Sequence, residues 1–466
     1  MTSPSQKGRW RTRSTALLSA LALAAPVLGA CSPEAEGAPV LRFMGPADGA
    51  DQYSAAAKNC SEAAGGRYTI EYDVSAKQTD DQRLQLARRI VGGDDSFDIM
   101  TLDVTWTPEF AEAGWAVPLP DDVAKRVADG TLSGPLETAT WKDTMYGAPL
   151  NTNTQLMWYR KSLMPKGPDG QPQPPKTWDE IADHAEKLAD EGKPSYIGVQ
   201  AAQFEGAVVW LNSMLESAGG SMIGEDGKTV TIGDGDAGQR ALETMHRVAT
   251  AKGADPSMSQ LDENQARLAF DRGDAFMQVN YPFVYAGVKE KAASGDKKAK
   301  EVADDIAWAP FPGLDADKPS KVTIGGLNLA VPSTSKYQKE AFEAIECLRN
   351  EENQMHNALT GGLPPTLTKL YTEATPEFEK EYPFYKEIFE SVSKLEPEEI
   401  TPEEKALLPD ERNVSVAVRP QSPAYQSMSI LLASRISPPQ DIDAGTLIDE
   451  LQTEMQDAVN SEGLVP

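Results

Sequence analysis

The stretch FDIMTLDVTWTPEFAEAGW, residues 97–115, combines a short apolar run with polar and aromatic residues directly after it. Residues 97–102 form this strand-like, mainly apolar run, and Asp103 and Trp106 follow it. A short apolar run of this length is typical of a buried strand. The stretch therefore predicts a core strand with an acidic and an aromatic residue at its carboxyl end.

Outward from this stretch, strand patterns alternate with helix patterns. A hydroxyl at Thr177 followed three residues later by Glu180 is a capping box, and the apolar positions after it lie on one helical face. Alternation of this kind predicts an α/β fold. The expected strands are 40–44, 68–74 and 97–102, and the expected helices are about 52–64 and 82–91, with a further helix after Thr177.

The N-terminus carries Lys7, Arg9, Arg11 and Arg13 ahead of an apolar run that ends in Gly29-Ala30-Cys31. It resembles a bacterial lipoprotein signal, whereas an ordinary secretory signal with a chance cysteine is the alternative. The resemblance implies a signal peptide at 1–30, a tether at 31–39 and acylation of Cys31. Several acyl chains suffice for durable anchoring. We therefore expect the protein at the cell membrane, lipid-anchored on its extracytoplasmic face.

The remaining 436 residues after such cleavage are too many for one ordinary core and predict two domains. The formal net charge of the whole chain is −27 at pH 7. Loss of a signal with four basic and no acidic residues would change it to −31. Such acidity repels phosphates, so nucleic acid is not expected as a partner.

With Cys31 committed to lipid, Cys60 and Cys347 remain in an oxidising compartment, where a disulfide is the expected use. Two buried free thiols are the alternative. The three histidines, His184, His246 and His356, are scattered with no paired-ligand spacing near either thiol. We expect neither a metal site nor a cofactor.

Several segments occur in the order typical of one family. They are Phe97–Met100 with Phe110–Trp115, Tyr146–Pro149 before Trp158–Arg160, Thr177–Glu180, Ala269–Ala275, and Ile324–Val331 before Ala341–Ile345. Together they resemble the extracellular sugar-binding proteins of ABC importers. The resemblance implies a two-lobed periplasmic-binding-protein-like fold of the maltose-binding-protein type, with a ligand cleft between discontinuous lobes. The implied first lobe is 40–150 plus 310–356, and the second is 151–309 plus 357–466.

Further segments narrow the resemblance to the lipoproteins of mycobacterial trehalose-recycling importers. They are Gln85–Arg89, Leu102–Val104, Pro149–Leu156, Lys321–Asn328, and Val418–Pro420 with Tyr425-Gln426. The resemblance implies a monomeric, non-enzymatic protein that binds a disaccharide, trehalose, and delivers it to the ABC permease subunits in the membrane. A related α-glucoside such as maltose is the alternative ligand.

A disaccharide presents hydroxyls at its edges and C–H patches on its ring faces, so its site needs hydrogen-bonding groups and aromatic platforms together. Asp103 follows a predicted strand, where open α/β sheets place their ligands, although a helix cap is the alternative role. Asn151 and Asn153 lie at the expected crossover between lobes, and either could contact the sugar.

Glu263 matches a sugar-contacting carboxylate of the family, but a first-turn carboxylate favoured by the helix dipole is equally open. The resembled lipoproteins have a stacking tryptophan at the position of Tyr281. The tyrosine keeps an aromatic face and adds a hydroxyl. Arg419 lies in a proline-stiffened loop, where its fork could donate to two hydroxyls; a surface arginine is the alternative. Further candidates are Asp48, Gln203, Glu205, Trp210 and Gly326, the last because glycine permits close backbone approach.

Asp103 and Glu263 could also imitate the carboxylate pair of a secreted glycoside hydrolase. Such a pair must be about 5 to 9.5 Å apart with one pKa raised, which sequence does not measure. The chain has no nucleophile elbow, phosphate loop or zinc-ligand helix pattern. We therefore expect no catalytic residues and a binding function.

Overall fold

The structure, a computed structural model, describes residues 37–76, 79–393, 400–409 and 411–461. The described residues between 38 and 461 belong to one compact unit. The predicted signal peptide 1–30 and Cys31 lie outside the described residues, as does most of the predicted tether. Within the described ranges, no helix has the length and apolar character needed to cross a bilayer.

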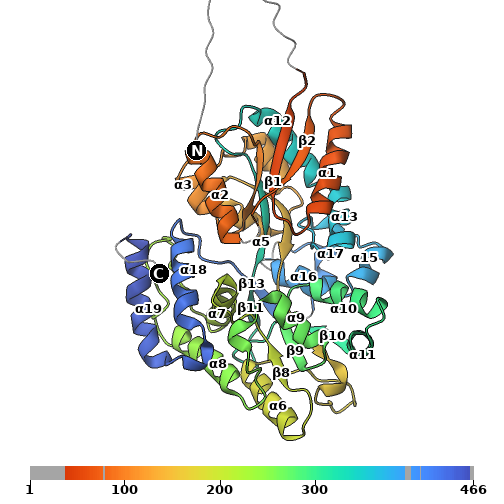
Figure 1. Ribbon diagram of the computed structural model, residues 1–466, viewed down its shortest axis with the longest axis vertical. Coiled ribbons are helices and arrows are strands. Elements are labelled where there is room, and N and C mark those ends of the chain that lie inside the picture. The colour runs from red at the N-terminus through yellow and green to blue at the C-terminus, as the bar shows by residue number, and fades with distance from the viewer. Residues whose placement is uncertain (1–36, 77–78, 394–399, 410, 462–466) are drawn as a thin grey trace, which may run out of the picture. The chain divides into compact units, whose positions relative to one another are not determined.

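The first large sheet has five strands in the order β2-β1-β3-β12-β6 (Figure 1). Strands β2, β1 and β3 are parallel, whereas β12 runs antiparallel to both β3 and β6. Its strands are β1 (Val40–Gly45), β2 (Thr69–Val74), β3 (Ile99–Asp103), β6 (Ala148–Asn153) and β12 (Gly325–Ala330). The three strands predicted between residues 40 and 102 are confirmed, with the third shifted so that Asp103 is its last residue.

Helices α1 (Ala50–Ala63) and α12 (Gln338–Leu348) pack with this sheet in one apolar core that includes Phe43, Ile99 and Ile345. The helix predicted at 82–91 is α2 (Thr79–Val91), which begins three residues earlier. It packs through Leu86 and Ile90 in a neighbouring apolar cluster. Both predicted helices are therefore confirmed.

The second large sheet has four strands in the order β10-β7-β9-β8. Strand β7 is antiparallel to both β10 and β9, and β8 is parallel to β9. These strands are β7 (Leu156–Arg160), β8 (Tyr196–Gly198), β9 (Ala275–Asn280) and β10 (Ile306–Ala309). The largest apolar core surrounds Trp178 and Trp210 beside this sheet. Its helices are α6 (Trp178–Asp190), α7 (Glu205–Ser217), α8 (Ala237–Thr250), α18 (Tyr425–Ile436) and α19 (Ala444–Val459).

The capping box predicted at Thr177 is confirmed. The Glu180 amide donates to Thr177 Oγ1 at 3.2 Å, and the Thr177 amide donates to Glu180 Oε2 at 3.3 Å. Both hydrogen bonds satisfy amide groups that the first helical turn would leave unpaired. Helix α6 therefore begins where its sequence predicts.

Two small sheets and eleven further α-helices belong to the described residues. Strand β11 (Ser320–Thr323) pairs in parallel with β13 (Val414–Ala417), and β4 (Thr140–Trp141) pairs with β5 (Thr144–Met145). The helices are α3 (Thr107–Glu112), α4 (Asp121–Ala128), α5 (Ser133–Thr138), α9 (Glu263–Asp271), α10 (Phe283–Ala293), α11 (Lys297–Asp305), α13 (Glu351–Gly361), α14 (Lys369–Thr372), α15 (Pro376–Glu381), α16 (Tyr385–Val392) and α17 (Pro402–Lys405).

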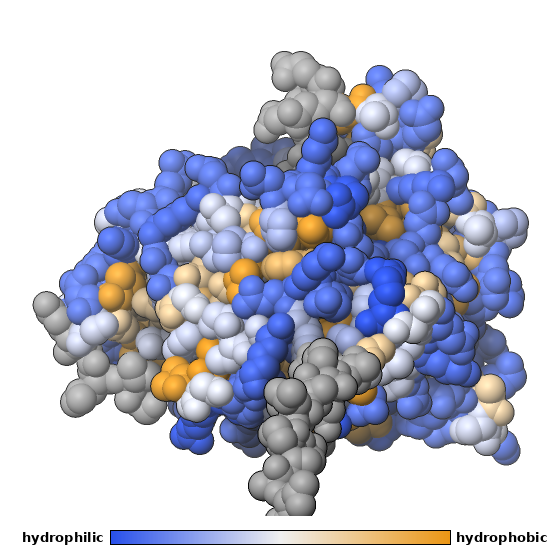
Figure 2. Space-filling model, turned by 90° about the horizontal axis from the view of Figure 1, so that it is seen from above, coloured by the Kyte–Doolittle hydropathy of each residue, from blue (hydrophilic) through white to orange (hydrophobic). Residues whose placement is uncertain are grey.

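The α/β fold class is thus confirmed, while the residue boundaries of the two lobes stay a prediction. The five-stranded sheet draws its strands from 40–103, 148–153 and 325–330, and the four-stranded sheet from 156–309. The surface seen in Figure 2 is mostly hydrophilic, with apolar residues in small groups. This surface agrees with the strongly acidic composition of the chain.

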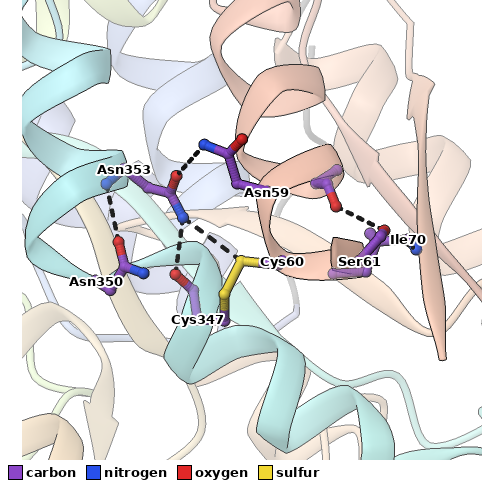
Figure 3. Close-up of a disulfide and its surroundings, with 8 residues drawn as sticks. Asn59, Cys60, Ser61, Ile70, Cys347, Asn350 and Asn353 are labelled. Atoms are coloured by element: carbon purple, nitrogen blue, oxygen red, sulfur yellow. Dashed lines mark hydrogen bonds between the residues drawn. A yellow bond between two sulfur atoms is a disulfide. The ribbon is translucent and has the colours of Figure 1, made fainter. Parts of the chain in front are cut away.

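A disulfide joins Cys60 of α1 to Cys347 of α12, with a Cα–Cα distance of 5.8 Å (Figure 3). The predicted pairing is confirmed. Both cysteines belong to the core of the five-stranded sheet. Asn353 Nδ2 donates to the Cys347 carbonyl at 2.9 Å, and Asn59 Nδ2 donates to Asn353 Oδ1 at 3.2 Å. The disulfide therefore fastens two helices that pack on the same sheet, although 287 positions separate them in sequence.

Replacing both cysteines, Cys60→Ser with Cys347→Ser, should lower the melting temperature of the protein. A crosslink across so long a loop restricts the unfolded chain, and the expected loss of unfolding free energy is on the order of 5 kcal/mol at most. Thermal unfolding of the double variant beside the wild type measures it. Peptide mapping without reduction should find Cys60 linked to Cys347, and free thiols at both positions would refute the pairing.

Candidate functional site

Five of the predicted site residues lie where secondary structure begins or ends. Asp103 is the last residue of β3, Tyr281 follows β9 directly and Arg419 lies two residues after β13. Glu205 and Glu263 are the first residues of α7 and α9. Carboxyl ends of strands and first turns of helices are places where an α/β fold presents polar groups to a ligand. The structure thus brings strand ends from three sheets to one site.

Arg419 connects three of these elements. Its side chain is only 5% exposed, with Nη2 lying 3.6 Å from Asp103 Oδ1 and Nη1 forming an ion pair with Glu205. Nη2 also donates to the Ile324 carbonyl at 3.3 Å. Although burial disfavours the charged form, the carboxylates of Glu205 and Asp103 raise the pKa of Arg419 well above its ordinary value. Arg419 therefore stays charged, and its alternative role as a surface arginine is wrong.

The two carboxylates beside Arg419 are held from further sides. Asp103 Oδ1 accepts hydrogen bonds from the Thr105 amide at 3.0 Å and from Thr105 Oγ1 at 2.8 Å. Tyr425 Oη donates to Glu205 Oε1 at 3.0 Å. The Asp103 and Glu205 side chains are 18% and 30% exposed, so solvent reaches both. We call Asp103, Glu205, Arg419 and Tyr425 the Arg419 cluster.

Thr105 and Tyr425 were not among the predicted site residues. The signal for Thr105 was its place two residues after Asp103, where a hydroxyl commonly bonds back to the preceding carboxylate. Tyr425 follows the same proline-stiffened loop as Arg419, at the start of α18. The partner of Thr105 is thus local in sequence, whereas the partner of Tyr425, Glu205, depends on tertiary packing.

Tyr281 and Glu263 lie next to the cluster and are tied to each other through Asn280. The Asn280 side-chain amide donates to the Glu263 carbonyl at 2.9 Å, and its oxygen accepts from the Tyr281 amide at 2.9 Å. Burial raises the pKa of Tyr281, with further contributions from the charges of Glu263, Glu205 and Asp103. The Tyr281 hydroxyl therefore remains a neutral hydrogen-bond donor among carboxylates.

Glu263 has the pKa best placed for titration near neutrality. Burial raises its pKa to about 7, and the charges of Asp262, Glu205 and Asp48 add to the increase. The side chain is nevertheless partly exposed. Protein atoms therefore surround most of the Glu263 carboxyl group, while one side of the residue stays open to solvent. A residue that contacts a ligand needs such partial exposure.

The two asparagines at the end of β6 differ in their surroundings. Asn151 is buried and accepts a hydrogen bond from Tyr53 Oη at 3.4 Å. Asn153 Oδ1 is buried without a hydrogen-bond partner among the described residues. Asn153 pairs with Gly325, where an added Cβ would lie 3.9 Å from Arg419 Nη2. These surroundings favour Asn153 over Asn151 as the residue that contacts a ligand.

Gly326 has a structural reason to be glycine. Its φ is +132°, and an added Cβ would lie 2.3 Å from the Asn151 carbonyl oxygen. Its own carbonyl accepts from the Val104 amide at 3.3 Å. The close approach that excludes a side chain is therefore between strands β12 and β6, rather than between this backbone and a ligand.

The other candidates lie at different distances from the cluster. Trp210 is fully buried and packs on Trp178 with ring centroids 5.5 Å apart, so the structure places it in the core rather than at the site. Gln203 is exposed in the turn before α7. Asp48, exposed after β1, contributes its charge to the environment of Glu263.

The arrangement supplies more acceptors than donors. The carboxylates of Asp103 and Glu205 lie beside the Arg419 guanidinium, and Tyr281 lies near the carboxylate of Glu263. Carboxylates accept hydrogen bonds from hydroxyls, and the arginine fork donates to oxygen atoms. Within the described residues, no three His, Cys, Asp or Glu side chains are grouped as metal ligands. The site is chemically suited to a neutral ligand rich in hydroxyl groups.

The fold is that of a solute-binding protein. Residues 47–355 match the family of bacterial extracellular solute-binding proteins, and the chain belongs to this family. A maltose-bound protein of T. maritima has the same fold, with a TM-score of 0.72 and 20% identity over 90% of this chain and 99% of that one. The maltose-binding-protein type of fold is therefore confirmed, and the family consists of binding proteins of ABC transporters, not enzymes.

Two curated relatives are similar in sequence. A probable ABC transporter-binding protein of Deinococcus radiodurans is 28% identical over 68% of this chain and 73% of its own length. A diacetylchitobiose-binding protein of Streptomyces coelicolor is 23% identical over 58% of this chain and 60% of its own length. These relatives support the family of importer binding proteins and leave the ligand of this chain to be proposed.

Replacing Arg419 with alanine should destabilise the protein as well as change the site. The change leaves the Glu205 carboxylate without its cationic partner, and the expected loss of unfolding free energy is roughly 1–3 kcal/mol. Arg126→Ala is the matched control, because Arg126 pairs with Asp122 and Glu346 at 53% exposure, where solvent screens the ion pairs, and its loss should change stability less. Chemical denaturation measures both. Equal losses in the two variants would contradict the structural role of Arg419.

The raised pKa of Glu263 should make stability depend on pH. A carboxyl whose pKa is higher in the folded than in the unfolded state stabilises the folded protein below its ordinary value near 4.5, and that contribution disappears as pH rises through about 7. As pH rises from 5 to 8, the melting temperature of the wild type should therefore decrease relative to that of Glu263→Gln. Exposed Glu243→Gln is the control and should follow the wild type. A constant difference between wild type and Glu263→Gln would exclude the shift.

Proposed function

We propose that this protein captures a disaccharide outside the membrane and delivers it to the permease of an ABC importer. The observation that carries the proposal is that Asp103, Glu205 and Arg419 lie together. Solvent reaches the two carboxylates, and the nearly buried Arg419 pairs with both of them. Sugar hydroxyls can donate to the two carboxylates while Arg419 holds them in place. Tyr281 offers an aromatic face beside them.

Trehalose is the disaccharide that we propose, with maltose as the alternative. The proposal for trehalose rests on the resemblance of Val418–Pro420 and the other quoted segments to the trehalose-binding lipoproteins. One similar protein has maltose bound, and another is named for binding diacetylchitobiose. A sugar ligand for this protein agrees with both. Asn153, with its unpaired oxygen, is proposed as an additional hydrogen-bond acceptor for the ligand.

The proposed mechanism is capture between two lobes, with the bound sugar favouring a closed arrangement. Asp103 ends β3 of the five-stranded sheet, and Glu205 begins α7, which packs beside the four-stranded sheet. A ligand that contacts both residues stabilises the arrangement in which these two parts of the protein are close. A lipid on Cys31 would keep the monomer at the membrane next to the permease.

Isothermal titration of the protein without residues 1–30 tests the proposal. Trehalose should bind at one site without added metal or cofactor. Asp103→Ala and Glu263→Ala should each weaken binding about ten- to a hundredfold, because each removes a hydrogen bond to a charged group. The exposed Glu243→Ala serves as the control. Heat of binding on titration with maltose, but not with trehalose, would show that trehalose is wrong and would support maltose as the ligand.

Incubation with trehalose and maltose separates binding from turnover. A binding protein leaves both sugars intact at saturating concentration, whereas release of glucose would indicate a hydrolase. If neither trehalose, maltose nor sucrose gives heat or a thermal shift, the proposal of a disaccharide ligand is wrong.

A further inference from the structure

Glu390 is a buried carboxylate in the last turn of α16, where two physical effects disfavour it. Burial removes water from the carboxylate and raises its pKa. The carboxyl end of a helix also carries a partial negative charge, which repels an acidic side chain. A group in such a place lowers stability unless its oxygen atoms have hydrogen-bond partners. The contacts of Glu390 therefore indicate what it does.

The partners of Glu390 are two backbone amides at the start of β13. Its Oε1 accepts from the Asn413 amide at 2.6 Å and from the Val414 amide at 3.2 Å. In the other direction, Arg412 Nη2 donates to the Glu390 carbonyl at 2.6 Å and to the Ser393 carbonyl at 2.9 Å. These hydrogen bonds join the start of β13 to the end of α16, and Figure 1 shows the two elements next to each other.

Strand β13 belongs to a sheet of only two strands. Among the described residues its partner in the sheet is β11, and the pairing runs over Val414–Ala417. Two strands alone form a sheet of marginal stability. A slip of one residue would move the chain by about 3.3 Å and turn every side chain to the opposite face. Because Glu390 bonds to the amides of two consecutive residues, it fixes the register at which β13 begins.

The register of β13 determines where Arg419 lies, two residues beyond the strand. The Ile324 amide donates to the Ala417 carbonyl at 2.9 Å, and Arg419 Nη2 donates to the Ile324 carbonyl at 3.3 Å. Arg419 Nη2 also lies 3.6 Å from Asp103 Oδ1. A displacement of about 3.3 Å along the strand would therefore separate these charges.

The residue next to Glu390 contacts a second strand that leads to the site. Ser391 Oγ and Thr154 Oγ1, both fully buried, lie 2.7 Å apart. Thr154 directly follows Asn153, the last residue of β6. The end of α16 therefore contacts the strand that carries Asn153 as well as the strand that precedes Arg419.

We propose that Glu390 is a positioning residue for the site, which places Arg419 in its ion pairs by fixing the register of β13. The inference rests on the proposed function and adds to it a residue that acts on the ligand only through Arg419. An uncharged side-chain oxygen at the same place can also accept from both amides. The role therefore requires the acceptor oxygen rather than the charge.

Two variants separate the acceptor oxygen from the space that the side chain fills. Glu390→Gln keeps an acceptor, whereas Glu390→Met keeps only the length. Titration calorimetry with trehalose and with maltose should give the wild-type affinity for Glu390→Gln and about tenfold weaker binding for Glu390→Met. Glu390→Asp, which is shorter by one methylene, should weaken binding several-fold, and it covers the case in which Glu390→Met does not fold.

The position of Arg419 can also be followed without a ligand, by NMR of protein made with isotope-labelled arginine. The Arg419 Nε is buried, so its proton is shielded from exchange with water. Its signal is identified by its absence from Arg419→Lys. The signal should shift in Glu390→Met and in Glu390→Asp and stay in place in Glu390→Gln.

Asp305→Leu is the matched control. Asp305 accepts from the Ser162 amide at 2.8 Å and pairs with Arg160, at the end of β7 that lies away from the site. This variant should lower the melting temperature, as Glu390→Met does, and leave the Arg419 signal and the sugar affinity unchanged.

A lower melting temperature of Glu390→Met with unchanged affinity and an unchanged Arg419 signal would overturn the inference. Equal weakening of sugar binding in Glu390→Gln and Glu390→Met would overturn it as well. Absence of all sugar binding in the wild type would overturn the proposed function instead, and the Arg419 signal would still decide whether Glu390 positions this side chain.

Discussion

The site depends on the ion pairing of one nearly buried arginine. Arg419 is supplied by the loop after β13, and its partners Asp103 and Glu205 come from the end of β3 and the start of α7. A buried guanidinium is unfavourable without acceptors, and two carboxylates near each other are unfavourable without a cation. Each group therefore requires the others, and three elements that are distant in sequence have to meet at one place.

The surroundings of Arg419 keep the carboxylates in fixed directions. Thr105 occupies one oxygen of Asp103, and Tyr425 donates to Glu205. Asn280 holds Glu263 and Tyr281 beside them by two hydrogen bonds. Preorganised polar groups lose little entropy when a ligand binds, which favours affinity. Burial raises the pKa of Glu263, and the nearby charges of Asp262, Glu205 and Asp48 add to the increase.

The disulfide acts on a different part of the molecule. Cys60 and Cys347 join two helices within the core of the five-stranded sheet, whereas the Arg419 cluster forms from strand ends and first helical turns. The disulfide and the Arg419 cluster therefore stabilise different parts of the molecule through separate interactions.

The sequence by itself determined the strand and helix order from residue 40 to 103, the helix start at Thr177 and the cysteine pair, because each rests on local periodicity, a local cap or compartment chemistry. It also offered Asp103, Glu263 and Arg419 as candidates: Asp103 from its place after a strand, Glu263 from the family resemblance and Arg419 from its proline-stiffened loop. Only the tertiary structure decided that Tyr425 pairs with Glu205, that Asn153 rather than Asn151 has a free oxygen and that Trp210 belongs to the core. It also decided that Gly326 is required by the neighbouring strand β6. These outcomes depend on which distant residues pack against a side chain, and a pattern along one chain carries no record of that contact.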